Sequence, residues 1–151
     1  MISKYLFYGL FFVTLGVNAQ GYNSNRIAFT NFLVRMYNAA PFEGVRAVED
    51  YDRAYLISVL ALDKTKYKTE AALNRIASVK AMAQASRYFN GSDITQEMII
   101  HTLESDENSE MRIIEEIKEN STGYVKKLEQ LTNFVRDDGM QVFIFIVELD
   151  L

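Results

Sequence analysis

The sequence predicts an α+β fold, in which an antiparallel sheet of about five to six strands carries one long helix on one face, together with a short N-terminal helix. Residues 68–90 have the composition of an uninterrupted helix, and Asn90-Gly91 follows as a stop signal, because glycine takes the left-handed conformation without steric cost. Runs typical of strands lie before and after this helix. The length of 151 residues is typical of a single domain with its own core.

The first residues have the three-part order of a secretory signal peptide. Lys4 supplies a positive charge, and residues 5–17 are apolar apart from one threonine. Small or β-branched residues then precede a cut between Ala19 and Gln20. An apolar run of 13 residues is too short for a membrane helix, which needs about 20. We therefore expect cleavage here and a mature protein that is periplasmic or secreted.

The expected domain organisation follows from this signal. Residues 1–19 form the signal peptide, residues 20–25 a flexible polar N-terminus, and residues 26–151 a single α/β domain. The chain contains no cysteine, which excludes disulfides, a lipid anchor on cysteine, thiol nucleophiles and cysteine-ligated metals. No second apolar run is long enough to span a membrane, so we expect no transmembrane span in the mature chain.

Two elements are predicted before the long helix. Apolar residues recur at three- and four-residue steps across residues 26–38, which indicates a short amphipathic helix that ends before Pro41. Residues 45–62 then predict a hairpin that turns at residues 50–53, because aspartate tolerates turn geometry. The second arm, residues 55–62, is apolar on both faces, as expected of a central strand.

The long helix has a stripe of small and apolar side chains at alternating steps of four and three residues. Such a stripe predicts the surface that lies against the sheet, because small side chains let a helix sit close to it. The predicted stripe consists of Ala72, Ile76, Val79, Ala83 and Ser86. We interpret it as core packing and not as a ligand site.

The segment after the long helix is less clearly patterned. Residues 94–103 predict a strand, and residues 104–110 a polar loop. Residues 111–120 fit the spacing of a helix and, less well, that of a strand, so both remain open. Residues 121–123 predict an interruption.

Residues 128–149 predict the clearest hairpin, because Asp138-Gly139 separates two strand-like runs. Both faces of its second arm are apolar, and the long helix can cover only one of them. If the N-terminal helix does not cover the other face, a partner must, since large exposed apolar patches are rare on monomers. The candidate interaction face is Val142, Phe143, Ile144, Phe145 and Ile146. The expected partner is a second copy of the chain or another envelope protein.

No motif of a known catalytic, metal or cofactor site is present. His101, the only histidine, lies in the predicted strand 94–103, and catalysis would need a nucleophile and an orienting carboxylate beside it. The net charge of −4 disfavours nucleic acid, whose phosphates need a basic surface. We therefore expect no catalytic residues, no cofactor, no metal and no nucleic-acid partner.

Two further sets of residues have the right chemistry for a site. One is the acidic group Glu104, Asp106, Glu107 and Glu110, which lacks the residue order of a calcium loop. The other is a supply of aromatic side chains near element ends, which suit interfaces or the rims of a core. These are Tyr37, Phe42, Tyr51, Tyr55, Tyr67, Tyr88, Phe89 and Tyr124.

The order of features between residues 55 and 149 supports a family resemblance. A strand runs into an alanine-rich helix that contains Asn74-Arg75-Ile76-Ala77 and ends at Tyr88-Phe89-Asn90-Gly91. A polar strand and a final hairpin through Asp137-Asp138-Gly139 follow. This order resembles the LPP-twenty family of small bacterial envelope lipoproteins.

The resemblance implies a compact α/β domain in the bacterial envelope, with a helix on an antiparallel sheet and no established enzymatic role. Members of that family carry a lipobox cysteine after the signal peptide, whereas this chain has Ala19-Gln20. The departure favours a periplasmic or secreted form without a lipid anchor.

The expected function is a non-enzymatic binding or assembly module that acts as a homo-oligomer or as part of an envelope complex. One alternative is a periplasmic carrier of a small apolar ligand between the long helix and the sheet, where Ala72 and Ala83 leave room. The weakest alternative is a hydrolase that uses scattered carboxylates and His101.

Overall fold

The computed structural model describes residues 24–91, 99–101 and 107–150 of the chain. The predicted signal peptide, residues 1–19, lies outside these residues. The elements in chain order are α1 (Ser24–Ala39), β1 (Gly44–Asp50), β2 (Arg53–Leu62), the 3-10 turn η1 (Lys64–Lys66), α2 (Glu70–Gly91), β3 (Ile99–His101), α3 (Glu107–Lys127), β4 (Glu129–Val135) and β5 (Gln141–Leu149).

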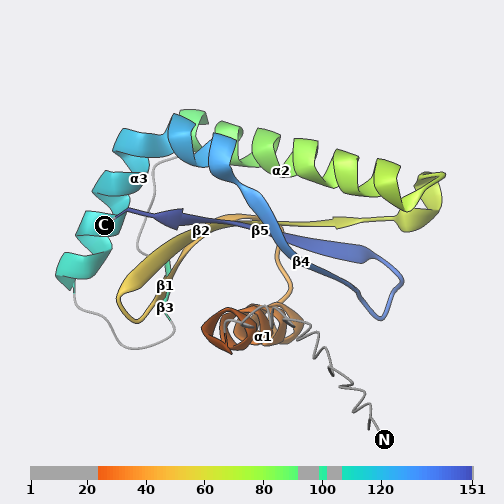
Figure 1. Cartoon of the computed structure of the whole chain (residues 1–151), viewed down its shortest axis with the longest axis horizontal. Helices are drawn as coiled ribbons and strands as arrows, with labels where there is room; N and C mark the ends of the chain where they lie inside the picture. Colours follow the sequence, from red (N-terminus) through yellow and green to blue (C-terminus); the bar gives the residue numbers. More distant parts are fainter. Residues whose placement is uncertain (1–23, 92–98, 102–106, 151) are drawn as a thin grey trace, which may run out of the picture.

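The fold has three layers, with the sheet in the middle (Figure 1). The strand order is β3-β1-β2-β5-β4. The four strands β1, β2, β5 and β4 form an antiparallel unit, and the short β3 joins its edge parallel to β1. Figure 1 shows α2 along one face of the sheet and α1 across the opposite face. The α+β class and a long helix on one face of the sheet are therefore confirmed. The prediction of one long helix and a purely antiparallel sheet is wrong, because α3 is a second long helix and β3 makes the sheet mixed.

The centre of the sheet is the pairing of β2 with β5, which runs from Ala54 opposite Leu149 to Leu62 opposite Gln141. Successive side chains of a strand point to opposite faces, so these two apolar strands contribute side chains to two separate cores, one on each face of the sheet. One core lies under α2 and the last part of α3. The other lies under α1, where Phe29, Leu33 and Tyr37 pack against the sheet. The predicted apolar character of both sheet faces is confirmed.

The covering of both faces corrects one sequence-based expectation. The candidate interaction face, residues 142–146, has relative exposures between 0 and 6%. Phe143 and Phe145 lie in the core on the α2 side, while Val142, Ile144 and Ile146 lie in the core on the α1 side. These residues are therefore core and not an exposed docking surface, and the apolar hairpin gives no reason to expect a homo-oligomer.

The buried stripe of α2 also differs from the predicted one. Its members are Leu73, Ala77, Ala81, Ala85 and Tyr88. The predicted stripe is offset from the observed one by one or two residues, and its member Val79 is 58% exposed. Small residues at this interface were correctly expected, since Ala77, Ala81 and Ala85 are fully buried.

Polar contacts with β2 explain which stripe faces the sheet. The buried Ser58 hydroxyl lies 3.3 Å from both the Ala81 carbonyl oxygen and Oε1 of Gln84, and it donates to one or the other. Nε2 of Gln84 in turn donates to the Val59 carbonyl oxygen over 3.4 Å. Satisfying a buried hydroxyl avoids a cost of about 1–3 kcal/mol, so Ser58 favours the rotation of α2 that brings Ala81 over it.

The ambiguous segment 111–120 is helical and belongs to α3, which runs from Glu107 to Lys127. The interruption predicted at residues 121–123 is wrong, because the helix continues through it. Gly123 in a helix costs about 1 kcal/mol relative to alanine, and burial of Tyr124 and Leu128 in the α2-side core offsets that cost. The polar loop predicted at residues 104–110 is helical from Glu107 onward, and its earlier residues lie outside the described part.

The remaining elements follow the sequence closely. The predicted short helix appears as α1, which begins at Ser24, so the last two residues of the predicted flexible segment 20–25 are helical. Both predicted hairpins are confirmed as β1–β2 and β4–β5. Only Ile99–His101 of the predicted strand 94–103 falls within the described residues, and it forms β3.

Candidate functional site

The strongest candidate site is a cleft of about 1100 Å³ between the start of α1 and the end of the sheet, which we call the α1 cleft. It opens where the β1–β2 turn, the last residues of β5, the first residues of β4 and the end of α3 meet. Its lining residues are Asn25, Arg26, Ala28, Phe29, Phe32, Asp50, Tyr51, Asp52, Arg53, Tyr55, Lys127, Glu129, Leu131, Ile146, Val147, Glu148 and Asp150.

Aromatic and aliphatic side chains form the floor of the α1 cleft. The ring centroids of Phe29 and Tyr55 are 4.7 Å apart, and Phe32 stacks on Phe29 at 6.3 Å. Leu131 of β4 and Ile146 of β5 extend this surface. Burial raises the pKa of the Tyr55 hydroxyl, and hydrogen bonding with Arg53 partly offsets that rise. The floor therefore offers apolar contact with a polar hydroxyl at its edge.

Two ion pairs border the cleft. Nη2 of Arg26 donates to Oε1 of Glu129 at 2.8 Å, which joins the start of α1 to the start of β4. Nη1 of Arg53 lies 3.6 Å from Oε1 of Glu148, which joins β2 to β5. All four side chains are more than half exposed, so each pair contributes at most about 1 kcal/mol. Such exposed pairs can open for a ligand at little cost.

One end of the α1 cleft is acidic. Asp50 and Arg53 are partners across the β1–β2 turn, and Tyr55 is the partner of Glu148 in β5. This register places the β1–β2 turn beside the end of β5. The cleft-lining carboxylates at this end are Asp50, Asp52, Glu148 and Asp150, and the cations that line the cleft are Arg26, Arg53 and Lys127. The acidic end therefore has an excess of negative charge.

Tyr51 stands at the mouth of this acidic end. Its side chain is 74% exposed, and its backbone φ is 56°. A residue with a Cβ in the left-handed region costs roughly 1–2 kcal/mol, so glycine or asparagine is usual there. An exposed tyrosine at such a position gains no core packing in return, which makes it a candidate recognition residue.

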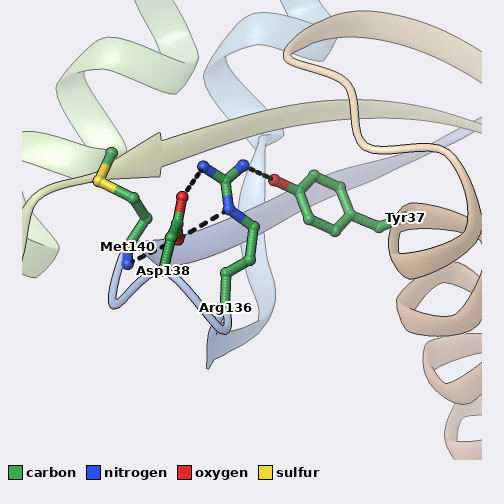
Figure 2. Close-up of polar contacts among 4 residues, drawn as sticks. All are labelled: Tyr37, Arg136, Asp138 and Met140. Carbon is green, nitrogen blue, oxygen red and sulfur yellow. Dashed lines mark hydrogen bonds and ion pairs between the residues drawn. The ribbon is translucent and has the colours of Figure 1, made fainter.

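The opposite end of α1 is fixed by a hydrogen-bond cluster (Figure 2). Nη1 of Arg136 donates to the Tyr37 hydroxyl at 3.0 Å, and Nε of Arg136 donates to Oδ1 of Asp138 at 2.9 Å. The same carboxylate accepts from the backbone N–H of Met140 at 3.1 Å. These hydrogen bonds lower the pKa of Asp138 to about 2. Gly139 completes the turn with a φ of 84°, which glycine adopts without strain.

A smaller cleft of about 330 Å³ lies at the start of α2. Lys64, Lys68 and Gln141 line its polar side, and Phe143 lies at its base. Thr69 Oγ1 accepts a hydrogen bond from the Ala72 N–H at 3.1 Å and so caps the helix. This arrangement is fully explained as the structure of a helix start.

Only some of the residues singled out from the sequence line the α1 cleft. Of the aromatic set, Tyr51 and Tyr55 line the α1 cleft, whereas Tyr37, Tyr88 and Tyr124 are buried in the two cores. His101 is the register partner of Glu49 in the parallel pair β1–β3. Glu104 and Asp106 lie outside the described residues. Within the described part of the chain, no group of three or more His, Cys, Asp or Glu side chains could hold a metal ion.

Most of the cleft was missed by reasoning from the sequence. Its borders depend on contacts such as Arg26 with Glu129, which are 103 residues apart in the chain. Two signals were nevertheless visible. Glu148 interrupts an apolar strand face, and the turn at Tyr51 carries an aspartate on each side. Charged residues at the end of apolar strands mark the edge of a core, where a cleft can open.

Within the described residues, no helix is long and apolar enough to cross a membrane. Comparison of the chain with protein-family models, curated proteins and solved structures finds no match.

Proposed function

We propose that this protein is an exported, non-enzymatic binding module of the LPP-twenty type, and that it holds the apolar part of a ligand in the α1 cleft. The observation that carries the proposal is the floor of the cleft, where Phe29, Phe32 and Tyr55 form a continuous aromatic surface between helix and sheet. Ligand sites are typically concave and mostly apolar, with a few polar groups that fix orientation.

The volume and the rim support the same proposal. Sites for small ligands measure about 300–1,000 Å³, and the α1 cleft reaches about 1100 Å³. Its ion pairs Arg26–Glu129 and Arg53–Glu148 offer both signs of charge at the border of the apolar floor. This combination suits a ligand with an apolar body and at least one polar group.

The alternative carrier function also fits better on the α1 face of the sheet than on the α2 face. The sequence suggested a ligand beneath the long helix, near Ala72 and Ala83. In the structure Ala83 is exposed, and the fully buried Ala77, Ala81 and Ala85 hold α2 close to the sheet. The α1 cleft is the better location for an apolar ligand.

An enzymatic function gains no support from the cleft. Glu129 and Glu148 are each engaged with an arginine, whereas paired-carboxylate catalysis needs one carboxyl that can give a proton and one that can receive it or attack. The proposal of a binding module therefore stands ahead of that of a hydrolase.

The binding test uses N-phenyl-1-naphthylamine, an uncharged aromatic dye that fluoresces in apolar surroundings. The exported chain should bind it with a dissociation constant in the micromolar range, on the order of −7 kcal/mol. Ala28 is exposed and lines the cleft, so Ala28→Phe should fill the cleft and weaken binding about tenfold. Ala39→Phe, at the other end of α1, is the matched control and should leave binding unchanged.

Two outcomes would contradict this part of the proposal. One is a folded wild-type protein that does not bind the dye. The other is equal binding by the Ala28→Phe and Ala39→Phe variants, which would place the dye elsewhere on the molecule.

Export has a separate test. N-terminal sequencing of the protein recovered outside the cytoplasm of a producing bacterium should begin at Gln20. Recovery of the uncut chain in the cytoplasm would contradict export while leaving the binding proposal untouched.

A further inference from the structure

We infer that the outer edge of β4 is a docking surface for β4 of a second copy of this chain, and that the two strands pair antiparallel to form a symmetric dimer. Strand β4 stands at the end of the sheet order β3-β1-β2-β5-β4. It pairs with β5 on one side, and no other strand of the described residues pairs with it on the other side. The docking surface is this edge and not the apolar faces of β5, which are buried.

The backbone of β4 presents hydrogen-bonding groups on its outer side. The N–H of Arg136 donates to the Met140 carbonyl oxygen at 2.8 Å. From this pair the register with β5 continues without a shift back to Thr132. In an antiparallel pair, residues that exchange hydrogen bonds alternate with residues whose N–H and C=O groups point away from the partner. Val135 and Asn133 therefore direct their backbone groups away from β5, where an added strand can bind them.

The strand lacks most of the features that protect a sheet edge from pairing. Such features are charged side chains, proline, and bulges that twist the edge away. Residues 130–135 contain no charged residue and no proline, and the Val135 side chain is 53% exposed. The one shift in register with β5 lies between Gln130 and Thr132, near the start of β4. The stretch from Thr132 to Val135 is therefore regular and available to a second strand.

Charge complementarity selects a second copy in the antiparallel orientation. Lys126 and Lys127 directly precede β4, and Asp137 follows it closely, with all three side chains exposed. An antiparallel pair places the start of one β4 beside the end of the other, so the lysines of each copy lie near its partner's Asp137. A parallel pair would instead bring like charges together. Charges at the rim of an interface select the partner and fix its register.

Most other charged side chains near the two ends of β4 already form ion pairs within the chain. Asp150, at the end of β5, adds one negative charge beside the start of β4, and the two lysines outnumber it. The start of β4 therefore keeps a positive excess and its end a negative one. The internal ion pairs are Arg26 with Glu129, Arg53 with Glu148, and Arg136 with Asp138.

The test is analytical ultracentrifugation of the exported chain over a range of concentrations. We expect a reversible equilibrium of monomer and dimer with a dissociation constant on the order of 10 μM, as for a small interface. Val135→Lys should weaken the dimer at least about tenfold, because a lysine on an edge strand opposes pairing. Val79→Lys is the matched control, since Val79 is 58% exposed on the outer face of α2, and should leave the dimer unchanged.

A charge reversal tests the orientation of the two strands. Asp137→Lys places a third cation opposite the partner's Lys126 and the partner's Lys127, and should weaken the dimer several-fold. Asp52→Lys makes the same change at an exposed position of the β1–β2 turn and should have no effect. Added salt should weaken the wild-type dimer, because it screens exposed charges.

Hydrogen exchange followed by NMR locates the interface without any variant. The amide protons of Asn133 and Val135 should exchange more slowly well above the dissociation constant than well below it. The amide proton of Phe134, which faces β5 in the alternating ladder, should be equally protected at both concentrations. Circular dichroism shows whether each variant is folded before its association is compared.

Four outcomes would overturn the inference. One is a chain that stays monomeric at about 1 mM, which corresponds to less than about 4 kcal/mol of binding. A second is a dimer that Val135→Lys and Val79→Lys affect equally, which would lie on another surface. A third is growth beyond the dimer, because two-fold pairing of one edge is closed. The fourth is protection of Asn133 and Val135 only in material that carries another protein, whose strand would then be the occupant.

Discussion

The Tyr37 hydroxyl accepts a hydrogen bond of 3.0 Å from Arg136, a residue 99 positions later in the chain. This contact fixes the end of α1 to the turn after β4 (Figure 2). Arg26 fixes the start of α1 to Glu129 at the start of the same strand. Helix α1 is therefore attached to β4 at both ends. At its Tyr37 end the helix packs tightly on the sheet, and the Tyr37 side chain is only 1% exposed. At its Arg26 end the α1 cleft opens between the helix and the sheet.

The first prediction concerns the attachment at Tyr37. Tyr37→Phe keeps the buried ring and removes the acceptor for Arg136, which retains Asp138. We expect the free energy of unfolding to fall by about 1 kcal/mol, measured by urea denaturation. Tyr67→Phe is the control, because no described hydrogen bond involves that half-buried side chain. An equal effect of both substitutions would show that the Tyr37 hydroxyl bond has no special role.

The second prediction tests which face of α2 meets the sheet. Ala81→Leu places a large side chain at a fully buried position and should destabilise the fold by about 1–3 kcal/mol. Ala83→Leu, two residues later on the exposed face, should change the stability by less than about 0.5 kcal/mol. Chemical denaturation of both variants decides between the observed stripe and the one predicted from the sequence. A larger loss for Ala83→Leu would contradict the structure.

The third prediction concerns alkaline pH. Burial raises the pKa of Tyr88 from 10.0 to about 12. Between these values the unfolded chain loses the phenolic proton while the folded chain keeps it, so stability falls as the pH rises. Below pH 10 both states are protonated and the group has no effect.

The measurement is the difference between the free energies of unfolding at about pH 8 and pH 11. This difference should be smaller for Tyr88→Phe than for the wild type. Tyr51→Phe, at an exposed position, is the control and should behave as the wild type. An unchanged difference for Tyr88→Phe would show that the buried hydroxyl does not couple folding to alkaline pH.

The fourth prediction separates stability from binding at Tyr51. Tyr51→Gly relieves the left-handed backbone conformation and should leave the stability unchanged or raise it by up to about 1 kcal/mol. Tyr51→Ala keeps the unfavourable φ and should not raise it. Both variants lack the ring, which lines the α1 cleft, and should bind N-phenyl-1-naphthylamine several-fold more weakly. A clear loss of stability in Tyr51→Gly would show that the tyrosine is held by packing and not for recognition.

Elements with local signals could be predicted from the sequence. The hairpin through Asp138-Gly139 was predicted correctly, because glycine supplies the positive φ of the turn. The spacing of Phe29, Leu33 and Tyr37 likewise predicted α1, because helical periodicity depends on near neighbours alone. The long helix α2 and the apolar character of both faces of β5 follow from the same kind of local pattern.

Features that depend on distant contacts could not be predicted in this way. Two stripes of α2, offset by one or two residues, both combine small and apolar side chains. The contacts of Ser58 in β2 with Ala81 and Gln84 in α2 decide between them. The covering of β5 on both faces depends on where α1 and α3 pack. The α1 cleft depends on Arg26 reaching Glu129, a contact that no local pattern shows.

The most direct test of the central claim is a two-dimensional ¹H–¹⁵N NMR titration of the exported chain with N-phenyl-1-naphthylamine. If the α1 cleft is the binding site, the largest shifts should fall on amides of Arg26, Tyr51 and Glu148, while amides of α2 such as Ala81 stay unchanged. Shifts centred on α2, or no shifts at saturating dye, would contradict the assignment of the α1 cleft as the binding site.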